Sequence, residues 1–193
     1  MNQKNLIIPM ENIEDHTDDL REWILDNRSQ IDRELWVDPF IPYNVFKLPH
    51  PAFFDLFFDI KNSFYEKAEA IGAHNYIQYY IHGWVNIFNK GDRIHWHNHC
   101  TDERPDMFHG VYCVDPAGES HTEYRDFETK EITETITSKQ GKGHFVCDMT
   151  TDHRSSINNS EEPRITIAFD IIPYFAYERS HEEPQGKHFI PFV

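Results

Sequence analysis

The apolar positions in the first third of the chain recur at helical spacing. Leu20, Trp23, Ile24 and Ile31 predict one helix from Glu14 to about Arg33, with acidic residues in its first turns. A second helix is predicted over residues 53–70, and Gly72 ends it. Its apolar stripe is rich in Phe and is typical of core packing, with members at positions 53, 54, 57, 58, 60, 64, 68 and 71.

After Gly72 the pattern changes to short β-rich segments separated by Gly, Pro and polar turns. Gly83 is expected to separate the first two strands, and residues 115–118 to form a turn. The predicted strands cover 76–82, 84–88, 108–114, 122–127, 132–136, 144–148, 155–157 and 164–172. Many short strands after two helices predict a mainly β protein with flanking helices, a jelly roll or double-stranded β-helix of cupin-like type.

The length of 193 residues fits one domain, 1–193, with a substantial core. We expect a helical flank over 1–72, with its first 13 residues extended, and a jelly-roll core over 73–172. The tail over 173–193 holds three prolines, so we expect it to wrap the core without regular structure.

Charge narrows the range of partners. Asp and Glu number 33 against 18 Lys and Arg, which gives a net charge of −15 and argues against nucleic acid and anionic membrane as partners. Three cysteines without a CxxC pair indicate a reducing compartment. With no signal peptide or membrane span in the sequence, we expect a cytoplasmic protein; its oligomeric state is not indicated.

The stretch His95-Trp96-His97-Asn98-His99 carries a histidine at every second position. In an extended segment, alternate side chains point to the same side, so the three imidazoles share a face. Imidazole is the commonest metal ligand near neutral pH, so this stretch is a candidate ligand array. A metal site between two strands needs a second source of ligands, for which His153 is the candidate, and Arg164-Ile165-Thr166 follows 11 residues later.

Four segments in order resemble the iron(II)/2-oxoglutarate-dependent oxygenases, in particular the prolyl-hydroxylase-related branch that includes bacterial and phage oxygenases. They are WVNIFNKGDRIHWHNH, FHGVYCVDP, GHFVCDMTTDH and RITIAFDI, and the resemblance covers about residues 79–172. It implies Fe(II), the co-substrate 2-oxoglutarate and dioxygen, with the first metal-binding pair in the histidine stretch and the distal ligand at His153. It also implies that Arg164 and Thr166 bind the co-substrate.

This chain departs from the family at the usual His-x-Asp or His-x-Glu pair, because the carboxylate position is His99. One ligand set is therefore His97, His99 and His153. In a second set, His97 and His153 bind the metal, Asp102 or Asp106 supplies the carboxylate, and His99 lies behind the ligands without binding the metal. In a third, the first pair is His95 and His97. The spacing after Gly91 favours His97 as first ligand. The other histidines, among them His109, are expected to be surface or packed residues.

The co-substrate needs an anchor for its far carboxylate, and an arginine fork suits this better than lysine. Arg164 has that role, and Thr166 on the same strand face can donate a further hydrogen bond. The alternative is a surface ion pair of Arg164 with Glu161 or Glu162. Asn86 and Tyr112 are further candidates for co-substrate contacts, each also explained as an ordinary strand residue.

Arg93, Arg125 and Trp96 are candidates for the wall of a substrate pocket. Asp152 precedes His153, but adjacent strand residues face opposite sides, so it is discounted as a partner of the ring.

The hypothesis is an oxygenase that converts 2-oxoglutarate and dioxygen to succinate and carbon dioxide while it hydroxylates an unactivated C–H bond of a small molecule or an amino-acid side chain. One rival is a cupin-like three-histidine dioxygenase that does not use 2-oxoglutarate. The other is a jelly-roll metal-binding protein without enzymatic activity.

Overall fold

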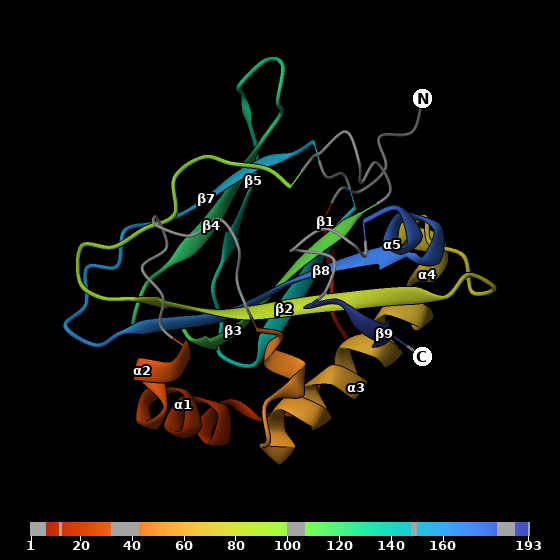
Figure 1. Cartoon of the computed structure of the whole chain (residues 1–193). Helices are drawn as coiled ribbons and strands as arrows, with labels where there is room; N and C mark the ends of the chain where they lie inside the picture. The colour runs from red at the N-terminus through yellow and green to blue at the C-terminus, as the bar shows by residue number, and fades with distance from the viewer. Residues whose placement is uncertain are drawn as a thin grey trace.

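The computed structural model describes residues 7–11, 13–31, 43–99, 107–147, 150–180 and 188–192. Within these ranges, nine strands form two antiparallel sheets (Figure 1). The six-stranded sheet has the order β1-β6-β3-β8-β2-β9, and the three-stranded sheet the order β5-β4-β7. The strands are β1 (Ile7–Pro9), β2 (Tyr79–Phe88), β3 (Phe108–Asp115), β4 (His121–Arg125), β5 (Ile132–Thr137), β6 (Lys142–Val146), β7 (Asp152–Ser155), β8 (Arg164–Pro173) and β9 (Ile190–Phe192).

Helices cover the outer face of the six-stranded sheet, below it in Figure 1. They are α1 (Thr17–Asp26), α2 (Arg28–Ile31), α3 (Pro51–Glu66) and α4 (Ala68–Ile71), with a 3₁₀ turn at Val45–Lys47. The short helix α5 (Tyr174–Ser180) follows β8 and lies at the right-hand end of the sheet in Figure 1, where Ala176 packs with Tyr80 and Ile172. The predicted mainly β architecture with flanking helices is confirmed. None of the helices in the described ranges combines the length and apolar character that crossing a bilayer requires.

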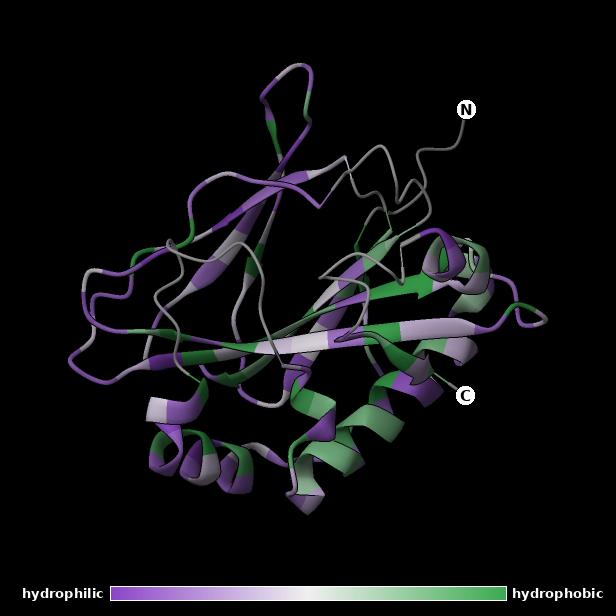
Figure 2. Cartoon of the chain, in the orientation of Figure 1, coloured by the Kyte–Doolittle hydropathy of each residue, from purple (hydrophilic) through white to green (hydrophobic). Residues whose placement is uncertain are grey.

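The Phe-rich helix forms as its sequence predicts. Pro51 occupies the first turn of α3, the His50 side chain accepts a hydrogen bond from the Ala52 amide, and Gly72 ends α4 with φ +84°. Phe53 and Phe64 are fully buried in the core that joins the helices to the sheet. Figure 2 shows this apolar layer along α3 and β8, in contrast to the more hydrophilic three-stranded sheet.

Alternate residues of β8 face two different environments. Ile165, Ile167 and Phe169 belong to the core on the helix side. Arg164 and Thr166 instead line a cavity on the other face of the sheet. The strand is thus buried on both faces. Its first residues alternate polar and apolar because one face lines the cavity, and its other face is apolar throughout.

Two strand boundaries differ from the prediction. Gly83 does not separate two strands but lies inside β2. Glycine fits this position because a Cβ there would come within 2.5 Å of the Phe46 ring and 2.9 Å of Val45. The strand predicted over 155–157 is β7, Asp152–Ser155, so that it includes His153.

The C-terminal segment is more regular than predicted. Tyr174–Ser180 is helical, and Ile190–Phe192 adds an edge strand to β2. Burial of Phe192 favours this pairing, and an edge position tolerates Pro191. Residues 181–187 lie outside the described residues.

Candidate metal centre and anion site

The histidine stretch lies antiparallel beside β7. The amide of His97 donates to the carbonyl of His153 (3.1 Å), and the amide of His153 donates to the carbonyl of His97 (2.8 Å). Further along, the amide of Ser155 donates to the carbonyl of Ile94 (3.2 Å). The predicted extended geometry is therefore realised as one isolated bridge, which sets the His97 and His153 rings 4.2 Å apart between centroids.

The three predicted ligands come together. His99 lies 5.4 Å from His97 and 5.2 Å from His153 between ring centroids. One ligand nitrogen from each of the three rings falls within 4.8 Å of the others. That they bind a metal remains a prediction. His95 is exposed and belongs to no such group, so the structure does not favour the pair His95 and His97, while Asp102 and Asp106 lie outside the described residues.

A second group, which the sequence reasoning missed, shares His99. Asp170 Oδ1 lies 3.0 Å from His99 Nδ1 and 3.1 Å from His109 Nδ1. One possible ligand atom from each of these three side chains lies within 4.8 Å of the other two, so they could also hold a metal ion. The rings of His99 and His109 stack with centroids 4.0 Å apart. His109 was expected to be an ordinary packed or surface histidine; its pairing with Asp170 comes from the register of β3 with β8.

Burial favours the neutral form of His97, His109 and His153. It lowers the pKa of His109 to about 3 and that of His153 well below its ordinary value, and it also lowers the pKa of His97. Burial alone raises the pKa of Asp170, but its interaction with His99 and its hydrogen bonds from His109 and His99 outweigh this effect and lower the pKa. Neutral imidazole is the form that binds metals.

The hydrogen bonds fix which nitrogen faces the centre. His97 Nδ1 donates to the carbonyl of His95 (2.9 Å), and His99 Nδ1 donates to Asp170, so each of these rings carries its lone pair on Nε2. His99 Nε2 and His153 Nδ1 are buried without a hydrogen-bond partner among the described residues. Buried imidazole nitrogens that converge and lack a partner among the described residues fit a transition-metal ion such as Fe(II).

The outer side of the histidine stretch is fixed by an aromatic stack. The guanidinium groups of Arg125 and Arg154 lie 4.2 Å and 4.6 Å from the centroid of Trp96. Asp152 accepts hydrogen bonds from Arg125 (2.9 Å) and from Asn98 (2.9 Å). The expectation that Asp152 faces away from the ligands is confirmed, whereas Trp96 and Arg125 contact each other instead of lining a pocket with the histidines.

Arg164 is 2% exposed and joins no ion pair with a carboxylate in the described part of the chain. Its guanidinium donates to Ser138 Oγ (3.1 Å) and to the His121 carbonyl (3.5 Å), and its Nε has no partner within the described ranges. The alternative of a surface ion pair is wrong, because Glu161 pairs with Lys90 and Glu162 with Arg21. Burial lowers the pKa of Arg164, yet a guanidinium stays protonated in proteins. A buried, unpaired cation costs several kcal/mol, so this position suits an anionic ligand.

Thr166 and Asn86 lie beside Arg164. Asn86 Nδ2 donates to Thr166 Oγ1 (3.3 Å), which leaves the Thr166 hydroxyl proton available as a donor. Asn86 Oδ1 is buried without a partner among the described residues. The Thr166 hydroxyl thus retains a donor for an anionic ligand, whereas the free Asn86 Oδ1 is an acceptor; the contact of Asn86 with the co-substrate stays a prediction.

Tyr112 does not reach the site. It lies on the face of β3 opposite His109 and belongs to the helix-side core with Leu20 and Val114, where burial raises its pKa. The prediction that Tyr112 contacts the co-substrate is therefore wrong, because the period of two along β3 turns it away.

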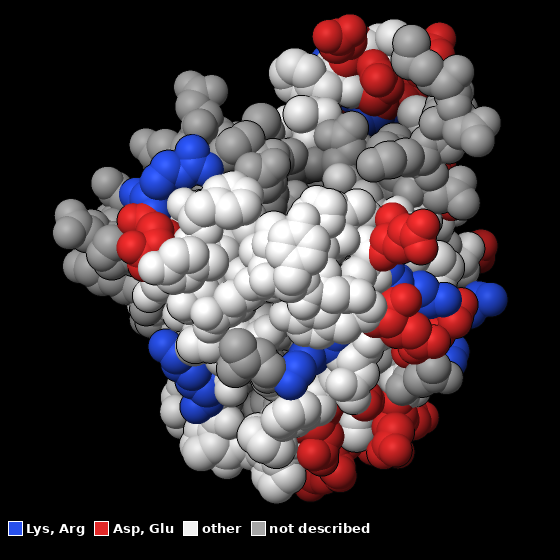
Figure 3. Space-filling view, turned by 90° about the vertical axis from the view of Figure 1, so that its right-hand side faces the viewer, with Lys and Arg blue, Asp and Glu red and all other residues white. Residues whose placement is uncertain are grey.

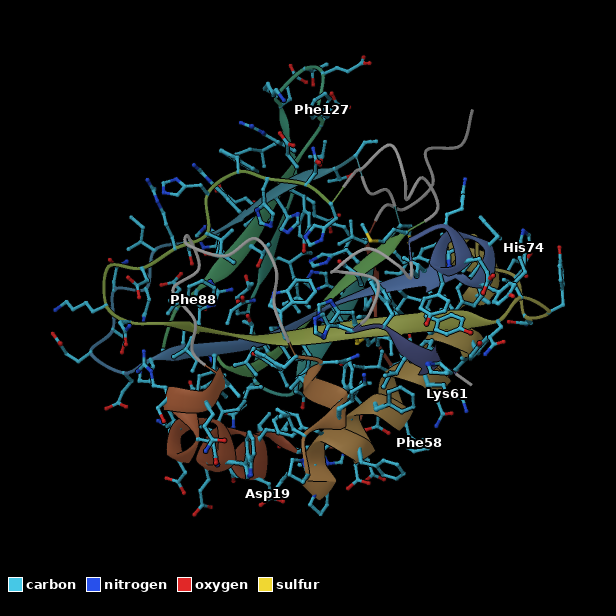
Figure 4. All side chains as sticks on the ribbon, in the orientation of Figure 1. Asp19, Phe58, Lys61, His74, Phe88 and Phe127 are labelled. Carbon is cyan, nitrogen blue, oxygen red and sulfur yellow. The ribbon has the colours of Figure 1, made fainter. Side chains whose placement is uncertain are left out.

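One cavity of about 50 Å³ joins the imidazoles to Arg164. Its apolar wall includes Val111, Ala168 and Phe88, the last of which is labelled on β2 in Figure 4. A larger cavity of about 470 Å³ adjoins it and shares Arg164 and Thr166. The anion site thus opens both toward the imidazoles and toward a space of the size that holds small ligands. Arg93 lines a separate surface groove.

Comparison with solved structures identifies the fold. A prolyl hydroxylase from Trichoplax adhaerens, in complex with a hypoxia inducible factor peptide, superposes with a TM-score of 0.66 at 10% identity over 89% of this chain and 86% of that one. The chain has the fold of the non-haem iron, α-ketoglutarate-dependent enzymes. The carbocyclase SnoK of nogalamycin biosynthesis gives a TM-score of 0.63 at 11% identity, over 88% of this chain and 80% of SnoK.

A further neighbour of this oxygenase fold holds the cofactors. The epimerase SnoN, in complex with Fe³⁺, α-ketoglutarate and nogalamycin RO, gives a TM-score of 0.61 at 9% identity over 88% of this chain and 80% of SnoN. No family model matches the chain, and no curated protein matches its sequence. The likeness therefore establishes the fold, and the chemistry rests on the residues of the site.

Proposed function

We propose that this protein is an Fe(II)- and 2-oxoglutarate-dependent oxygenase. The observation that carries the proposal is the cavity that joins converging imidazoles to a buried arginine, which has no carboxylate partner among the described residues. A metal-binding protein without this co-substrate has no use for the buried cation of Arg164, whereas a dicarboxylate that chelates a metal needs both ends of the cavity.

In this proposal His97, His99 and His153 hold the iron. Because these are only three protein ligands, a bound iron would keep coordination positions for a chelating co-substrate and for dioxygen. Iron bound there would activate dioxygen: one oxygen atom would enter the substrate C–H bond, and the other would enter the succinate that forms from 2-oxoglutarate with loss of carbon dioxide.

The protein's own contribution is orientation and exclusion of water. Arg164 anchors the far carboxylate of 2-oxoglutarate through a planar fork, and the Thr166 hydroxyl donates a second hydrogen bond to it. Asn86 is placed to position the co-substrate from β2. Apolar side chains of the cavity wall, such as Val111 and Ala168, keep the space between the two groups dry.

The charge of the protein surface disfavours one class of substrate. On the face shown in Figure 3, acidic side chains gather along one side and the lower edge, and basic ones are scattered. Together with the net charge of −15, this surface disfavours nucleic acid. We propose a small molecule or an amino-acid side chain as substrate.

A second candidate is a three-histidine dioxygenase that does not use 2-oxoglutarate. The observation that favours it is the set His97, His99 and His153, which has no carboxylate. The two candidates differ at Arg164, which only the first requires for co-substrate binding.

The test is calorimetric titration of 2-oxoglutarate into Mn(II)-loaded protein under anaerobic conditions. The proposal predicts binding to the wild type and its loss in Arg164→Leu, with Arg164→Lys between the two because lysine keeps the charge but not the fork. No binding of 2-oxoglutarate by the wild type favours the second candidate, and equal binding by wild type and Arg164→Leu contradicts the role of Arg164.

A further inference from the structure

We propose that Asp170 is a positioning residue that fixes His99 with its Nε2 toward the metal, and that it supplies from behind the ligand the negative charge that a direct carboxylate ligand would bring. The inference rests on the metal centre of the proposed function. It deepens that proposal by assigning the second, overlapping group of His99, His109 and Asp170 a role in hydrogen bonding, not in coordination.

One carboxylate oxygen of Asp170 accepts hydrogen bonds from two histidine rings. Asp170 Oδ1 lies 3.0 Å from His99 Nδ1 and 3.1 Å from His109 Nδ1, both normal hydrogen-bond lengths. A carboxylate oxygen that accepts two N–H bonds fixes both rings as Nδ1–H tautomers. Metal-bound histidines commonly donate their other nitrogen to a carboxylate in this way, which orients the ring and raises its basicity.

Three buried imidazole nitrogens lack a hydrogen-bond partner among the described residues: His99 Nε2, His109 Nε2 and His153 Nδ1. If Asp170 and the two Nδ1 atoms held the ion, then Nε2 of His99 and Nε2 of His109 would both remain buried without a partner among the described residues. With the ion at His97, His99 and His153, the orphaned His99 Nε2 and His153 Nδ1 both gain a partner. Of the three orphaned imidazole nitrogens in the described residues, His109 Nε2 alone then stays without one. The arrangement that satisfies more buried polar atoms is the more stable one.

Asp170 is 7% exposed, and its ion-pair contacts among the described residues are the two imidazoles. A buried carboxylate whose only donors are neutral leaves a net negative charge in the protein interior. A divalent cation bound to the opposite nitrogen of the His99 ring would offset this charge. Three neutral imidazoles in turn leave the ion fully charged. Asp170 and the ion therefore compensate each other across His99.

The experiment is Co(II) binding by the full chain, measured by visible absorption in competition with a chelator. Asp170→Asn keeps the shape and an accepting oxygen but removes the charge, so Co(II) affinity should fall tenfold to a hundredfold, about the effect of losing an outer partner. Asp115→Asn is the control for net charge, because Asp115 pairs with Arg21 at the sheet surface and its loss should leave the affinity unchanged. His99→Ala should lose binding altogether, and His109→Ala should stay within a few-fold of wild type.

The direct-ligand alternative makes opposite predictions. If Asp170 coordinates the ion, then Asp170→Asn and His109→Ala both abolish Co(II) binding to the extent that His99→Ala does, while His97→Ala binds normally; either result overturns the proposal. Unchanged affinity in Asp170→Asn, with a normal wild type, overturns the role of Asp170 alone. Failure of the wild type to bind Co(II) overturns the metal centre itself, and so the two failures are distinct.

A second measurement does not depend on any variant folding. Nitrogen-15 NMR of the imidazoles in metal-free wild type should show His99 and His109 with their protons on Nδ1. A proton on Nε2 of His99 contradicts the proposal.

Discussion

His97 and His153 exchange both of their backbone hydrogen bonds across one isolated antiparallel bridge, at 3.1 Å and 2.8 Å. Residues more than fifty positions apart in the chain are thereby held with their rings 4.2 Å apart between centroids. The backbone, and not a loop that must close, sets the distance between the first and the distal predicted ligand. Such a site is preorganised before a metal arrives.

This relationship predicts that either histidine is required for metal binding and neither for folding. His97→Ala and His153→Ala should each lower Co(II) affinity by more than about a hundredfold, since even the partners of ligands contribute tenfold to a hundredfold. Their circular dichroism should match that of the wild type. His95→Ala, in the same stretch but exposed, is the matched control and should bind normally. Equal losses in all three variants would contradict the assignment.

The Thr166 hydroxyl should contribute to co-substrate binding as a single hydrogen bond. Thr166→Val removes the hydroxyl at nearly constant volume, and it should weaken 2-oxoglutarate binding by about threefold to tenfold, as expected for roughly 0.5–1.5 kcal/mol. Thr166→Ser keeps the hydroxyl and should restore most of the affinity. Calorimetric titration measures both, and a Thr166→Ser variant as weak as Thr166→Val would rule out the hydrogen bond.

His144 should make the protein less stable in acid. Burial lowers its pKa to about 4, and it accepts a hydrogen bond from the Tyr124 hydroxyl. The unfolded chain therefore binds a proton that the folded chain refuses, so the stability is full above the unfolded pKa and falls as the pH drops from about 6.5 to about 4. Between pH 7.5 and 5.0 this histidine alone should lower the free energy of unfolding by about 2 kcal/mol.

Urea unfolding at these two pH values, with a chelator present, measures the effect. His144→Gln keeps an acceptor for Tyr124 and should lose about 2 kcal/mol less than wild type on acidification. His95→Gln, at an exposed position, should behave as wild type. A His144→Gln variant with the wild-type pH dependence would show that other groups cause it.

Gly83 should tolerate no side chain while Phe46 packs against β2. Gly83→Ala places a Cβ 2.5 Å from the Phe46 ring, and overpacking of this kind costs about 1–3 kcal/mol. Phe46→Leu removes the atoms that the new methyl group would meet. In a double-mutant cycle, Gly83→Ala should therefore cost less in the Phe46→Leu background than in wild type. Additive effects would contradict a direct clash.

The sequence allowed the fold class and the two ends of the cavity to be predicted for different physical reasons. Hydrophobic period distinguishes helix from strand, and the alternation of polar residues in the histidine stretch and in Arg164-Ile165-Thr166 survives in the structure as a shared face. These signals are local, so they needed no knowledge of which strands pair.

What was missed depends on long-range register. His109 and Asp170 meet because β3 pairs with β8 so that the two residues lie opposite each other, and no local pattern contains that information. A signal for Asp170 did exist, since an acid inside an apolar strand on the same face as Arg164 needs a partner. The same period of two turns Tyr112 to the helix side, away from the cavity. The edge strand at Ile190–Phe192 forms through tertiary pairing with β2.

The central claim is that one cavity holds iron at its imidazoles and 2-oxoglutarate between the iron and Arg164. Anaerobic titration of Fe(II)-loaded protein with 2-oxoglutarate tests it most directly, because chelation of the iron by the co-substrate produces a visible charge-transfer band. The account predicts a band that saturates at one equivalent of 2-oxoglutarate in the wild type and is weakened in Arg164→Leu. An Fe(II)-loaded wild type that shows no band at saturating 2-oxoglutarate would contradict it.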